Sequence, residues 1–459
     1  VRIRNVYVQE ELPDIAGMNV KGVVRDKNGN PLSGVAVSDG VEIVTTDEEG
    51  RYYFYSDKSL GRVFISLPSG YMPETVMNIP QISRRFMATN LSVEQFDFTL
   101  RPVDNDRCVL IASTDYHLAR RNNDLEQFRD FVNDVNRFIL TEQRPVYVLT
   151  MGDLTWDEYW YKNYFTLGDF ITEMKDLNTV AFHCIGNHDH DQTTILSDSL
   201  GTVYFEMYLG PTCYSVELGE LHFIFLDNIV MKNNTLDPNN VGAYSDGLSD
   251  EAYSWLCNDL KYVDKDRTVM LCAHSSMFRK PDSEPADRDR HGPDYASRLA
   301  QYRCVHSWAG HSHINFNYAY SAEEPAPKFP NVESHILARS TGALWLNESM
   351  SSDGTPRGYM VVEVDGEAVS WYYKPYSYEN DVPSGLDRSH QIRVYAPGVW
   401  YSDGYVYANV WNHDARWGAV RYTDSGKSDA EMKRVTVYDG AFVRMANYYN
   451  SVQTTATFE

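Results

Sequence analysis

The chain has 459 residues, and this length alone suggests about three domains rather than one simple core. Its hydrophobic content of 43% is ordinary for a globular protein, and no run of about 18 apolar residues exists, so we predict no transmembrane segment. The formal net charge of −23 argues against a non-specific nucleic-acid surface, which needs basic patches, and we expect no nucleic-acid partner.

The first predicted domain covers residues 1–102. Residues 1–18 show no clear period and are interpreted as a lead-in that lacks a charged-then-apolar leader. We therefore expect a mature, exported protein, periplasmic or at the cell surface, whose signal peptide has been removed, although a trimmed fragment would look the same. From residue 19, short alternating runs are broken by Gly, Asn and Pro turns, which predicts a small β-sandwich.

The second predicted domain covers residues 103–376, where strand-like and helix-like patterns alternate. Residues 108–113, 145–151 and 179–185 are apolar and typical of buried strands. Between the first two runs, apolar residues recur at helical spacing, which predicts a helix around residues 125–139. This alternation is typical of a layered α/β fold.

Polar clusters close most of these apolar runs, and they contain the residues Asp115, His117, Asp153, Asn187, His188, Asp189, His274, His311 and His313. The carboxyl ends of strands line the crevice where ligands bind in layered α/β folds. Residues far apart in the chain can therefore converge on one spot. Carboxylate and imidazole side chains bind hard or borderline cations, so the set is sufficient for two divalent metals. Paired metals about 3.5–4 Å apart are suited to phosphoryl chemistry.

The third predicted domain covers residues 377–459 and turns back to β character, with many aromatic residues and no helical period. We interpret it as a second small β domain. The predicted fold is thus an α/β core flanked by two small all-β domains. The six cysteines form no C-x-x-C pair, and most lie in apolar stretches, so we interpret them as buried small hydrophobes.

Two segments resemble known families. Residues 19–100 resemble the transthyretin-type, carboxypeptidase-regulatory-like β domain. The resemblance lies in the short sequence segments that begin at Gly22, Pro31 and Thr46. Residues 108–345 resemble the calcineurin-like metallophosphoesterase superfamily. The pattern of that superfamily is D-x-H, G-D, G-N-H-[DE], a lone H and G-H-x-H, and every element of it is present in this segment. The order of the three parts is similar to a bacterial variant that is usually exported. The resemblance implies an α-β-β-α sandwich core.

The same resemblance implies a ligand set. Asp115, His117 and His313 would bind one metal, Asn187, His274 and His311 the other, and Asp153 would bridge both. The metals would be Mn, Zn, Fe or a mixture. Purple acid phosphatases carry a Tyr ferric ligand three residues after the bridging Asp, where this chain has Trp156, which disfavours an iron(III)–tyrosinate site. A metal-bridging hydroxide would attack the phosphorus.

The resemblance also implies that His188 binds no metal and would assist the leaving group by giving it a proton or hydrogen bond. Asp189 either orients that imidazole or caps a helix start. Four further residues are candidate substrate contacts, and each also has a plainer interpretation. Tyr116 contacts substrate or packs, Trp156 forms a pocket wall or packs, His190 contacts substrate or faces solvent, and Arg279 meets a phosphate or lies in a solvated loop.

The predicted function is hydrolysis of a phosphate mono- or diester by a dinuclear-metal phosphoesterase. A sugar- or lipid-linked phosphate ester is one option for the substrate. Two alternatives stay open: a glycan- or partner-binding protein with an inactive phosphoesterase core, and an extracellular nuclease or nucleotidase. The intact ligand set and His188 argue against the first alternative, and the net charge of −23 argues against the nuclease. The sequence leaves the oligomeric state open.

Overall fold

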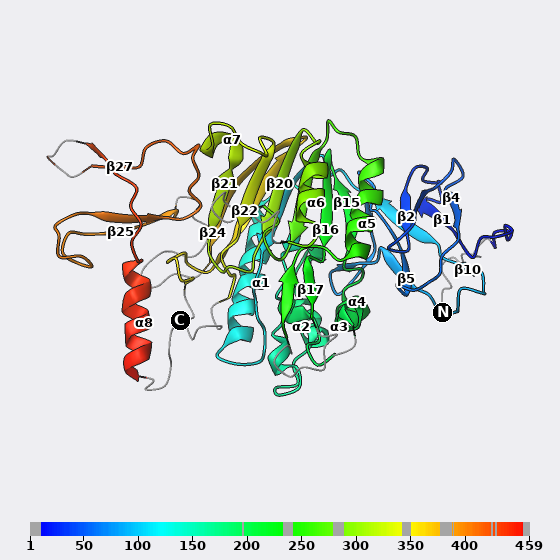
Figure 1. Cartoon of the computed structure of the whole chain (residues 1–459), viewed down its shortest axis with the longest axis horizontal. Helices are drawn as coiled ribbons and strands as arrows, with labels where there is room; N and C mark the ends of the chain where they lie inside the picture. Colours follow the sequence, from blue (N-terminus) through cyan, green and yellow to red (C-terminus); the bar gives the residue numbers. More distant parts are fainter. Residues whose placement is uncertain are drawn as a thin grey trace.

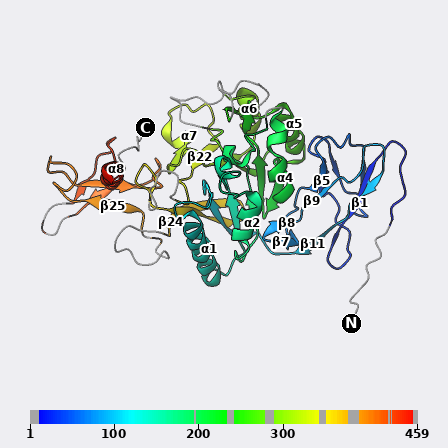
Figure 2. The same ribbon diagram turned by 90° about the horizontal axis from the view of Figure 1, so that it is seen from below.

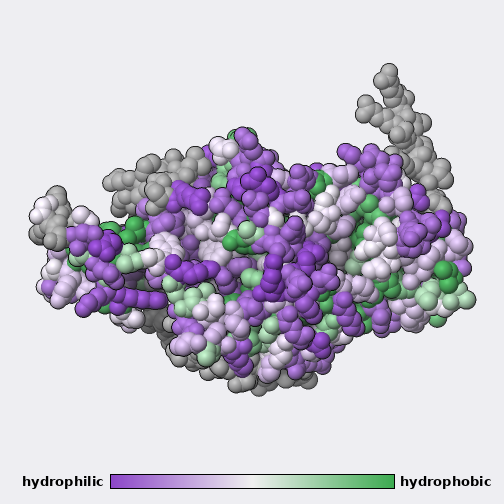
Figure 3. All heavy atoms as spheres, turned by 90° about the horizontal axis from the view of Figure 1, so that it is seen from above, coloured by the Kyte–Doolittle hydropathy of each residue, from purple (hydrophilic) through white to green (hydrophobic). Residues whose placement is uncertain are grey.

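The computed structural model describes residues 11–194, 197–232, 242–278, 289–341, 350–376, 388, 390–423, 426 and 429–452. Three regions follow one another along the long axis of the molecule, with a β-rich N-terminal region, a larger α/β core and a smaller C-terminal region (Figure 1). Hydrophilic residues cover most of the face seen in Figure 3. Within the described residues, every helix is too short or too polar to cross a bilayer.

The N-terminal region contains two small sheets packed around shared apolar residues. One has the order β10-β1-β11-β6, with β4 also on β1; its strands are β1 (Val20–Asp26), β4 (Arg51–Phe54), β6 (Tyr71–Pro73), β10 (Glu94–Gln95) and β11 (Phe98–Pro102). The other has the order β3-β2-β5-β9, with β2 (Ala36–Ser38), β3 (Ile43–Thr45), β5 (Arg62–Ile65) and β9 (Ser83–Arg85). A short hairpin joins β7 (Thr75–Val76) and β8 (Ile79–Pro80). The all-β character expected for this region is confirmed.

The core begins with a mixed sheet of order β14-β13-β12-β23-β24. Its strands are β12 (Arg107–Ser113), β13 (Val146–Thr150), β14 (Ala181–His183), β23 (Gly358–Asp365) and β24 (Ala368–Pro375). The first three are parallel, and β23 and β24 run antiparallel to their neighbours. Helices α1 (Asp124–Thr141) and α2 (Leu167–Met174) cover its outer face, where Phe128 and Phe170 pack with Val109 and Ile111.

The second core sheet has the order β15-β16-β19-β20-β22-β21. Its strands are β15 (Tyr214–Leu218), β16 (Leu221–Leu226), β19 (Thr268–Ala273), β20 (Cys304–Ala309), β21 (Phe316–Ala319) and β22 (Val332–Ile336). Strands β16, β19, β20 and β22 are parallel. Helices α5 (Asp250–Asp259) and α6 (Gly292–Leu299) lie on the side of the sheets opposite to α1 and α2 (Figure 2). The predicted α-β-β-α sandwich is confirmed.

Short elements connect these layers. They are the α-helices α3 (Asp198–Gly201), α4 (Val203–Tyr208) and α7 (Tyr320–Glu323), the 3₁₀ turns η1 (Asp157–Tyr159), η2 (Asn187–Asp189) and η4 (Leu260–Tyr262), and the hairpin of β17 (Ile229–Met231) with β18 (Tyr244–Asp246). The N-terminal region docks on the core through Leu67, which bridges to Val216, and through a 2.6 Å contact between the hydroxyls of Ser66 and Ser215.

The C-terminal region contains two hairpins and a helix. The hairpins pair β25 (Ile392–Tyr395) with β26 (Tyr407–Val410) and β27 (Arg421–Tyr422) with β28 (Ala430–Glu431), in agreement with the predicted β character. Helix α8 (Gly440–Val452) was not predicted. Ala441, Phe442 and Met445 share one helical face and join a small apolar cluster with Tyr395. The apolar pattern formed by these three residues is about one helical turn long, and the aromatic residues around it make the helical period hard to recognise in the sequence.

Candidate metal centre

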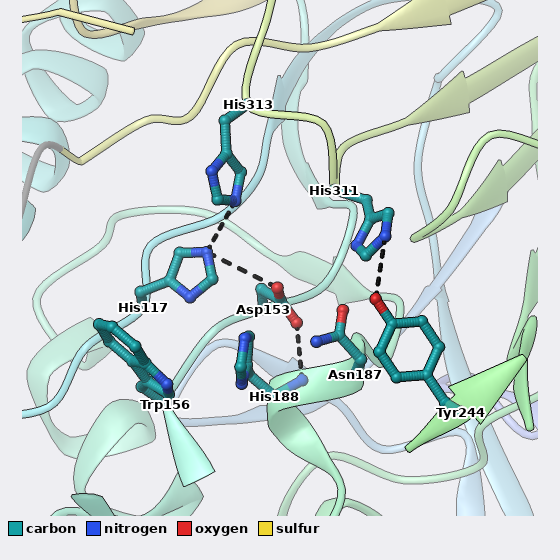
Figure 4. Close-up of a pocket in the computed structure, with 8 residues that line it drawn as sticks. All are labelled: His117, Asp153, Trp156, Asn187, His188, Tyr244, His311 and His313. Atoms are coloured by element: carbon teal, nitrogen blue, oxygen red, sulfur yellow. Dashed lines mark hydrogen bonds and ion pairs between the residues drawn. The ribbon is translucent and has the colours of Figure 1, made fainter. Parts of the chain in front are cut away.

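Seven predicted donor side chains gather where five strands end. Figure 4 draws five of them: His117, Asp153, Asn187, His311 and His313. In the first sheet, Asp115 and His117 follow β12, Asp153 follows β13, and Asn187 follows β14. In the second sheet, His274 follows β19, and His311 and His313 follow β20. All five strands are parallel to a neighbour within their own sheet, so their carboxyl ends lie at one edge of the sandwich.

One group of donors comprises Asp115, His117, Asp153 and His313, whose ligand atoms all lie within 4.8 Å of one another. The Nε2 atoms of His117 and His313 are 3.1 Å apart. Asp115 Oδ1 lies 3.5 Å from His117 Nε2 and 3.2 Å from His313 Nε2. Distances of this size are those between neighbouring ligands of one metal ion with bonds of about 2.0–2.2 Å.

A second group comprises Asp153, His274 and His311, again within 4.8 Å of one another, with Asn187 beside them. His274 Nε2 is its centre. It lies 3.0 Å from Asn187 Oδ1, 3.1 Å from His311 Nδ1 and 3.2 Å from Asp153 Oδ2. The set of two imidazoles, one amide oxygen and one carboxylate suits a borderline divalent cation.

Asp153 belongs to both groups through the same oxygen atom. Its Oδ2 lies 3.6 Å from His117 Nε2 and 3.2 Å from His274 Nε2. The other oxygen, Oδ1, accepts a 2.9 Å hydrogen bond from the backbone N–H of His188. One atom is therefore left to serve two neighbouring positions, which is the arrangement of a carboxylate that bridges two cations.

The hydrogen bonds around the donors leave their lone pairs directed at the centre. The Nδ1 atom of His274 lies 2.6 Å from the carbonyl oxygen of Met151 and must donate to it, so Nε2 carries the lone pair. Asp115 Oδ2 accepts from the hydroxyl of Thr114 and the N–H of His311, whereas its buried Oδ1 has no hydrogen-bond partner among the described residues. A buried carboxylate oxygen without a donor is costly, and a cation would satisfy it. The residues thus fit two divalent metals.

The charges of the centre also favour cations. Burial would raise the pKa of Asp115, but His313 and His117 hold it well below its usual range, so the carboxylate stays ionised. Burial lowers the pKa of His311 to about 4, which keeps this imidazole neutral and able to bind a metal. Asp153 and Asp115 overcome the effect of burial and raise the pKa of His274 to about 10. Electrostatically, a positive charge at that nitrogen is favoured, whether it comes from a proton or from a metal.

The backbone is unusual at this centre. Five donors have left-handed φ angles: 54° at Asp115, 46° at His117, 52° at Asp153, 66° at His311 and 57° at His313. Such angles are uncommon for residues other than glycine, and they persist only where the surrounding structure enforces them.

Two glycines allow the loops of the centre to approach closely. A Cβ at Gly186 would lie 2.2 Å from the backbone nitrogen of Asp153, and one at Gly310 would lie 1.9 Å from Thr114 Oγ1. Any side chain at either position would push a donor-bearing loop away.

His188 lies next to both donor groups, and its side chain is 25% exposed. Its Nδ1 atom lies 2.7 Å from Oδ1 of Asp157, a residue of turn η1. Burial would lower the pKa of this imidazole, but Asp153 and Asp157 raise it above its ordinary value. The ring therefore presents Nε2 to the cavity and can carry a proton there.

The prediction that Asp189 orients His188 is wrong, because the carboxylate on that imidazole is Asp157. Asp189 is fully buried and accepts hydrogen bonds from the backbone N–H groups of Leu154 (3.1 Å), Thr155 (2.9 Å) and Gly186 (3.0 Å). It therefore caps the turn η2, as the alternative interpretation stated, and ties the loop after β14 to the loop after β13.

A cavity of about 250 Å³ opens over the centre, and it is lined by His117, Asp153, Trp156, Asn187, His188, Tyr244, His311 and His313. Trp156 lies at this wall, as one of its two interpretations proposed. Its ring packs on His117 and His188, and the guanidinium of Arg121 lies 4.6 Å from its centroid on another side. The hydroxyl of Tyr244 lies 3.2 Å from His311 Nε2 across the cavity (Figure 4).

Three other candidate substrate contacts have different outcomes. Tyr116 is 1% exposed and packs on Phe128 in the outer core, because its side chain points away from the two ligands that flank it. His190 is fully buried, so it neither faces solvent nor lines the cavity. Its Nδ1 lies 2.8 Å from the carbonyl of Gly186 and its Nε2 lies 3.4 Å from Asp227. Arg279 lies outside the described residues.

Sequence reasoning missed two cavity-side residues. Asp157 follows Asp153 by four positions, and an acidic residue so close to a predicted ligand was a usable signal. Tyr244 lies on β18, which follows β17 after a long polar segment of the sequence, and nothing in its local sequence points to the centre.

Three family models match the chain. The model described as calcineurin-like phosphoesterase matches residues 110–315, which contain all seven donors. Models of the N-terminal and C-terminal parts of calcineurin-like phosphoesterase match residues 18–103 and 335–458. No curated protein matches the chain.

Several solved structures are similar to the protein at low sequence identity. A dimetal phosphatase from Danio rerio shares 12% identity over 58% of this chain and 95% of its own, with a TM-score of 0.38. A purple acid phosphatase from yellow lupin seeds shares 11% identity over 77% of this chain and 69% of its own, with a TM-score of 0.40. A 5′-nucleotidase from Candida albicans shares 12% identity over 59% of this chain and 51% of its own, with a TM-score of 0.34.

Proposed function

The chain belongs to the calcineurin-like phosphoesterase family and is a metal-dependent phosphoester hydrolase, and we propose that it cleaves a phosphate mono- or diester at two metal ions held around Asp153. The observation that carries this proposal is the position of Asp153 Oδ2, which is common to both groups of donors and lies beside His188.

Asp115, His117 and His313 would hold one ion, Asn187, His274 and His311 the other, and Asp153 both. When bound, the ions supply Lewis acidity and lower the pKa of water at the centre, so that a nucleophile is available near neutral pH. The neutral imidazoles limit the negative charge of the ligand set. The occupied centre therefore keeps a net attraction for an anionic phosphate ester.

His188 is placed to act on the leaving group. Asp157 accepts from Nδ1–H and orients the ring, which leaves Nε2 to give a proton to the departing oxygen. The raised pKa of His188 favours the protonated form needed for this step. The backbone N–H of the same residue holds Asp153, so the proton donor and the shared ligand are fixed relative to each other.

Trp156 and Tyr244 are proposed to bind the alcohol part of the ester. They stand on different sides of the cavity, and aromatic faces pack well on the apolar faces of sugars and other rings (Figure 4). A volume of about 250 Å³ is at the small end for a ligand site, so a small leaving group such as one sugar unit would fit.

The test uses purified protein stripped of metal with a chelator and reconstituted with Mn²⁺, Zn²⁺ or Fe²⁺. We expect hydrolysis of p-nitrophenyl phosphate or bis-p-nitrophenyl phosphate to vanish on stripping and to return with metal, and the ratio of the two rates distinguishes mono- from diesterase activity. His188→Ala should keep its metals and lose about 10²–10⁴-fold in kcat. An intact, metal-loaded protein without turnover on either ester would support the binding-protein alternative instead.

A further inference from the structure

A second cluster of potential ligands lies between the two core sheets, away from the centre described above. It comprises His306 on β20 and Glu333 and His335 on β22, and their ligand atoms all lie within 4.8 Å of one another. His306 pairs with Glu333 across the two parallel strands, and Trp308 pairs with His335. Alternate residues of a strand share a face, so both imidazoles and the carboxylate project on the same side of the sheet.

The inner nitrogens of the two imidazoles face each other. His306 Nδ1 lies 3.1 Å from His335 Nε2, and Glu333 Oε2 lies 3.9 Å from His306 Nδ1. The separation of the two imidazole nitrogens is close to the 3.2 Å between Asp115 Oδ1 and His313 Nε2 in the first centre, and the carboxylate oxygen lies somewhat farther away. Both imidazoles are at most 5% exposed.

The outer nitrogen of each imidazole has its own partner. His335 Nδ1 lies 2.8 Å from Asn317 Oδ1, and the amide of Asn317 is itself oriented because its Nδ2 donates a 2.6 Å hydrogen bond to Asn412. His335 therefore carries its proton on Nδ1 and its lone pair on Nε2, toward His306. His306 Nε2 lies 3.6 Å from the sulfur of Cys304, which can accept as well as donate. An outer hydrogen bond of this kind is typical of histidines that ligate metals.

Glu333 divides its two oxygens between a cation and the cluster. Oε1 accepts a 2.8 Å hydrogen bond from Arg416, whose charge is also balanced by Asp414 at 2.9 Å. Oε2 is buried, has no hydrogen-bond partner among the described residues and points toward the imidazoles. A cation bound by the two imidazoles would satisfy it.

We propose that His306, Glu333 and His335 bind one Zn²⁺ ion as a third, structural metal site. Two imidazole nitrogens and one carboxylate oxygen form a ligand set that zinc favours, and water can complete four-coordination. Burial lowers the pKa of His306 to about 4 and holds the pKa of His335 well below its usual range, so both rings are neutral and able to bind a metal. His306 precedes His311 by five residues on or just after β20, which places the site roughly 15 Å from the dinuclear centre.

The position of this site indicates its role. Trp371 on β24 packs on the rings of both His306 and His335, so the ion would lie where the two sheets meet. From the C-terminal region, Arg416 contacts Glu333 directly and Asn412 contacts Asn317, the partner of His335. A bound ion would therefore clamp β20 and β22 beneath the point where the C-terminal region attaches.

Metal stoichiometry tests the proposal. Stripped protein is titrated with Zn²⁺, desalted and analysed by plasma mass spectrometry. We expect three equivalents in the wild type and two in Glu333→Gln, a near-isosteric change that removes the charged donor. In Glu333→Gln, the affinity for the third ion should fall below that of the wild type by more than roughly 10–100-fold, which is the cost of losing a hydrogen-bond partner of a metal ligand. His413→Gln, a half-buried histidine of the C-terminal region outside the cluster, should keep three.

Two further variants separate this site from the dinuclear centre. Asp153→Asn should lose the two ions of the dinuclear centre and keep one tightly bound Zn²⁺. The double variant Asp153→Asn with Glu333→Gln should lose that Zn²⁺ as well. Glu333→Gln should also retain phosphoesterase turnover, and that activity serves as the evidence that the variant is folded. If Glu333→Gln does not fold, the same measurement is made on His335→Gln. Two equivalents in the wild type, or three in folded Glu333→Gln, would overturn the proposal and leave a metal-free hydrogen bond between the two imidazoles.

Discussion

His188 Nδ1 lies 2.7 Å from Oδ1 of Asp157, a carboxylate that precedes it by 31 residues and belongs to a different loop. The pair joins the segment after β13 to the segment after β14. It fixes which nitrogen of the imidazole faces the cavity, and it keeps that ring beside the two donor groups. The arrangement makes Asp157 a positioning residue for His188.

Asp157→Asn should therefore lower kcat without removing metal. The neutral amide cannot stabilise the charged imidazolium, and we expect a loss of about 10–100-fold, by analogy with the loss of carboxylate partners from metal-ligating histidines. The effect should be larger on esters with poor leaving groups, because these need the proton most. Steady-state rates on a series of substituted phenyl phosphates measure it. Glu158→Gln changes the adjacent, exposed acid and should leave the rate unchanged.

Asp153→Asn should weaken the binding of both metals at once. Asp153 Oδ2 is common to the two donor groups, so its charge supports both cations. We expect metal affinity to fall by at least the 10–100-fold that loss of an outer ligand partner costs, measured by competition with a chelating dye. The control is Asp191→Asn, a buried aspartate that accepts from Tyr161 at 2.7 Å and lies outside both groups. Loss of one ion alone from Asp153→Asn would contradict a shared ligand.

Gly310→Ala should damage the metal centre by displacing Asp115. The added Cβ would lie 1.9 Å from Thr114 Oγ1 and 2.5 Å from Asp115 Oδ2, and forced overpacking costs typically about 1–3 kcal/mol. A lower melting temperature together with weaker metal binding is the expected result. Gly418→Ala is the matched control, because a Cβ there meets nothing within 4 Å. Equal behaviour of the two variants would show that the loop can move without cost.

The stability provided by His222 should depend on pH. Burial opposes its protonation, but Glu217 at 2.6 Å and Asp259 at 2.8 Å raise its pKa to about 10. The folded pKa exceeds the unfolded value of about 6.5, so the stabilisation is complete below that pH and is lost as pH rises through 10. His222→Gln should cost on the order of 2–4 kcal/mol at about pH 6 and much less at about pH 10.5. Denaturant melts at both values measure it, and an equal cost at each would contradict the assigned charge.

The donors could be predicted from sequence because each follows an apolar run. Asp153 and His274 follow strands whose residues are all buried, so a polar side chain there needs a purpose that packing does not supply. The α-β-β-α core could be predicted for a similar reason, since the period of its apolar residues changes from strand to helix spacing. The polar residue after an apolar run and the change of apolar spacing can both be read from neighbouring residues in the chain, although the donors that they predict come together only in the folded structure.

Partners across loops could not be predicted in this way. Asp189 stands next to His188 in sequence, yet its carboxylate turns to backbone N–H groups, and the more distant Asp157 reaches the imidazole. Tyr116 adjoins two donors but points into the core. Which direction a side chain takes within a turn depends on φ and ψ, and sequence neighbours do not reveal them. The exported location and the sugar- or lipid-linked substrate stay predictions.

The left-handed backbone at five of the donors has a consequence for how the centre tolerates change. Those angles persist only where the surrounding fold enforces them, so exchanging one metal for another should retune reactivity while the surrounding loops keep their form. Conversely, slight loosening of those loops would relax the donors to commoner angles. Heat or denaturant should then release the ions, and abolish turnover, well before the helices melt.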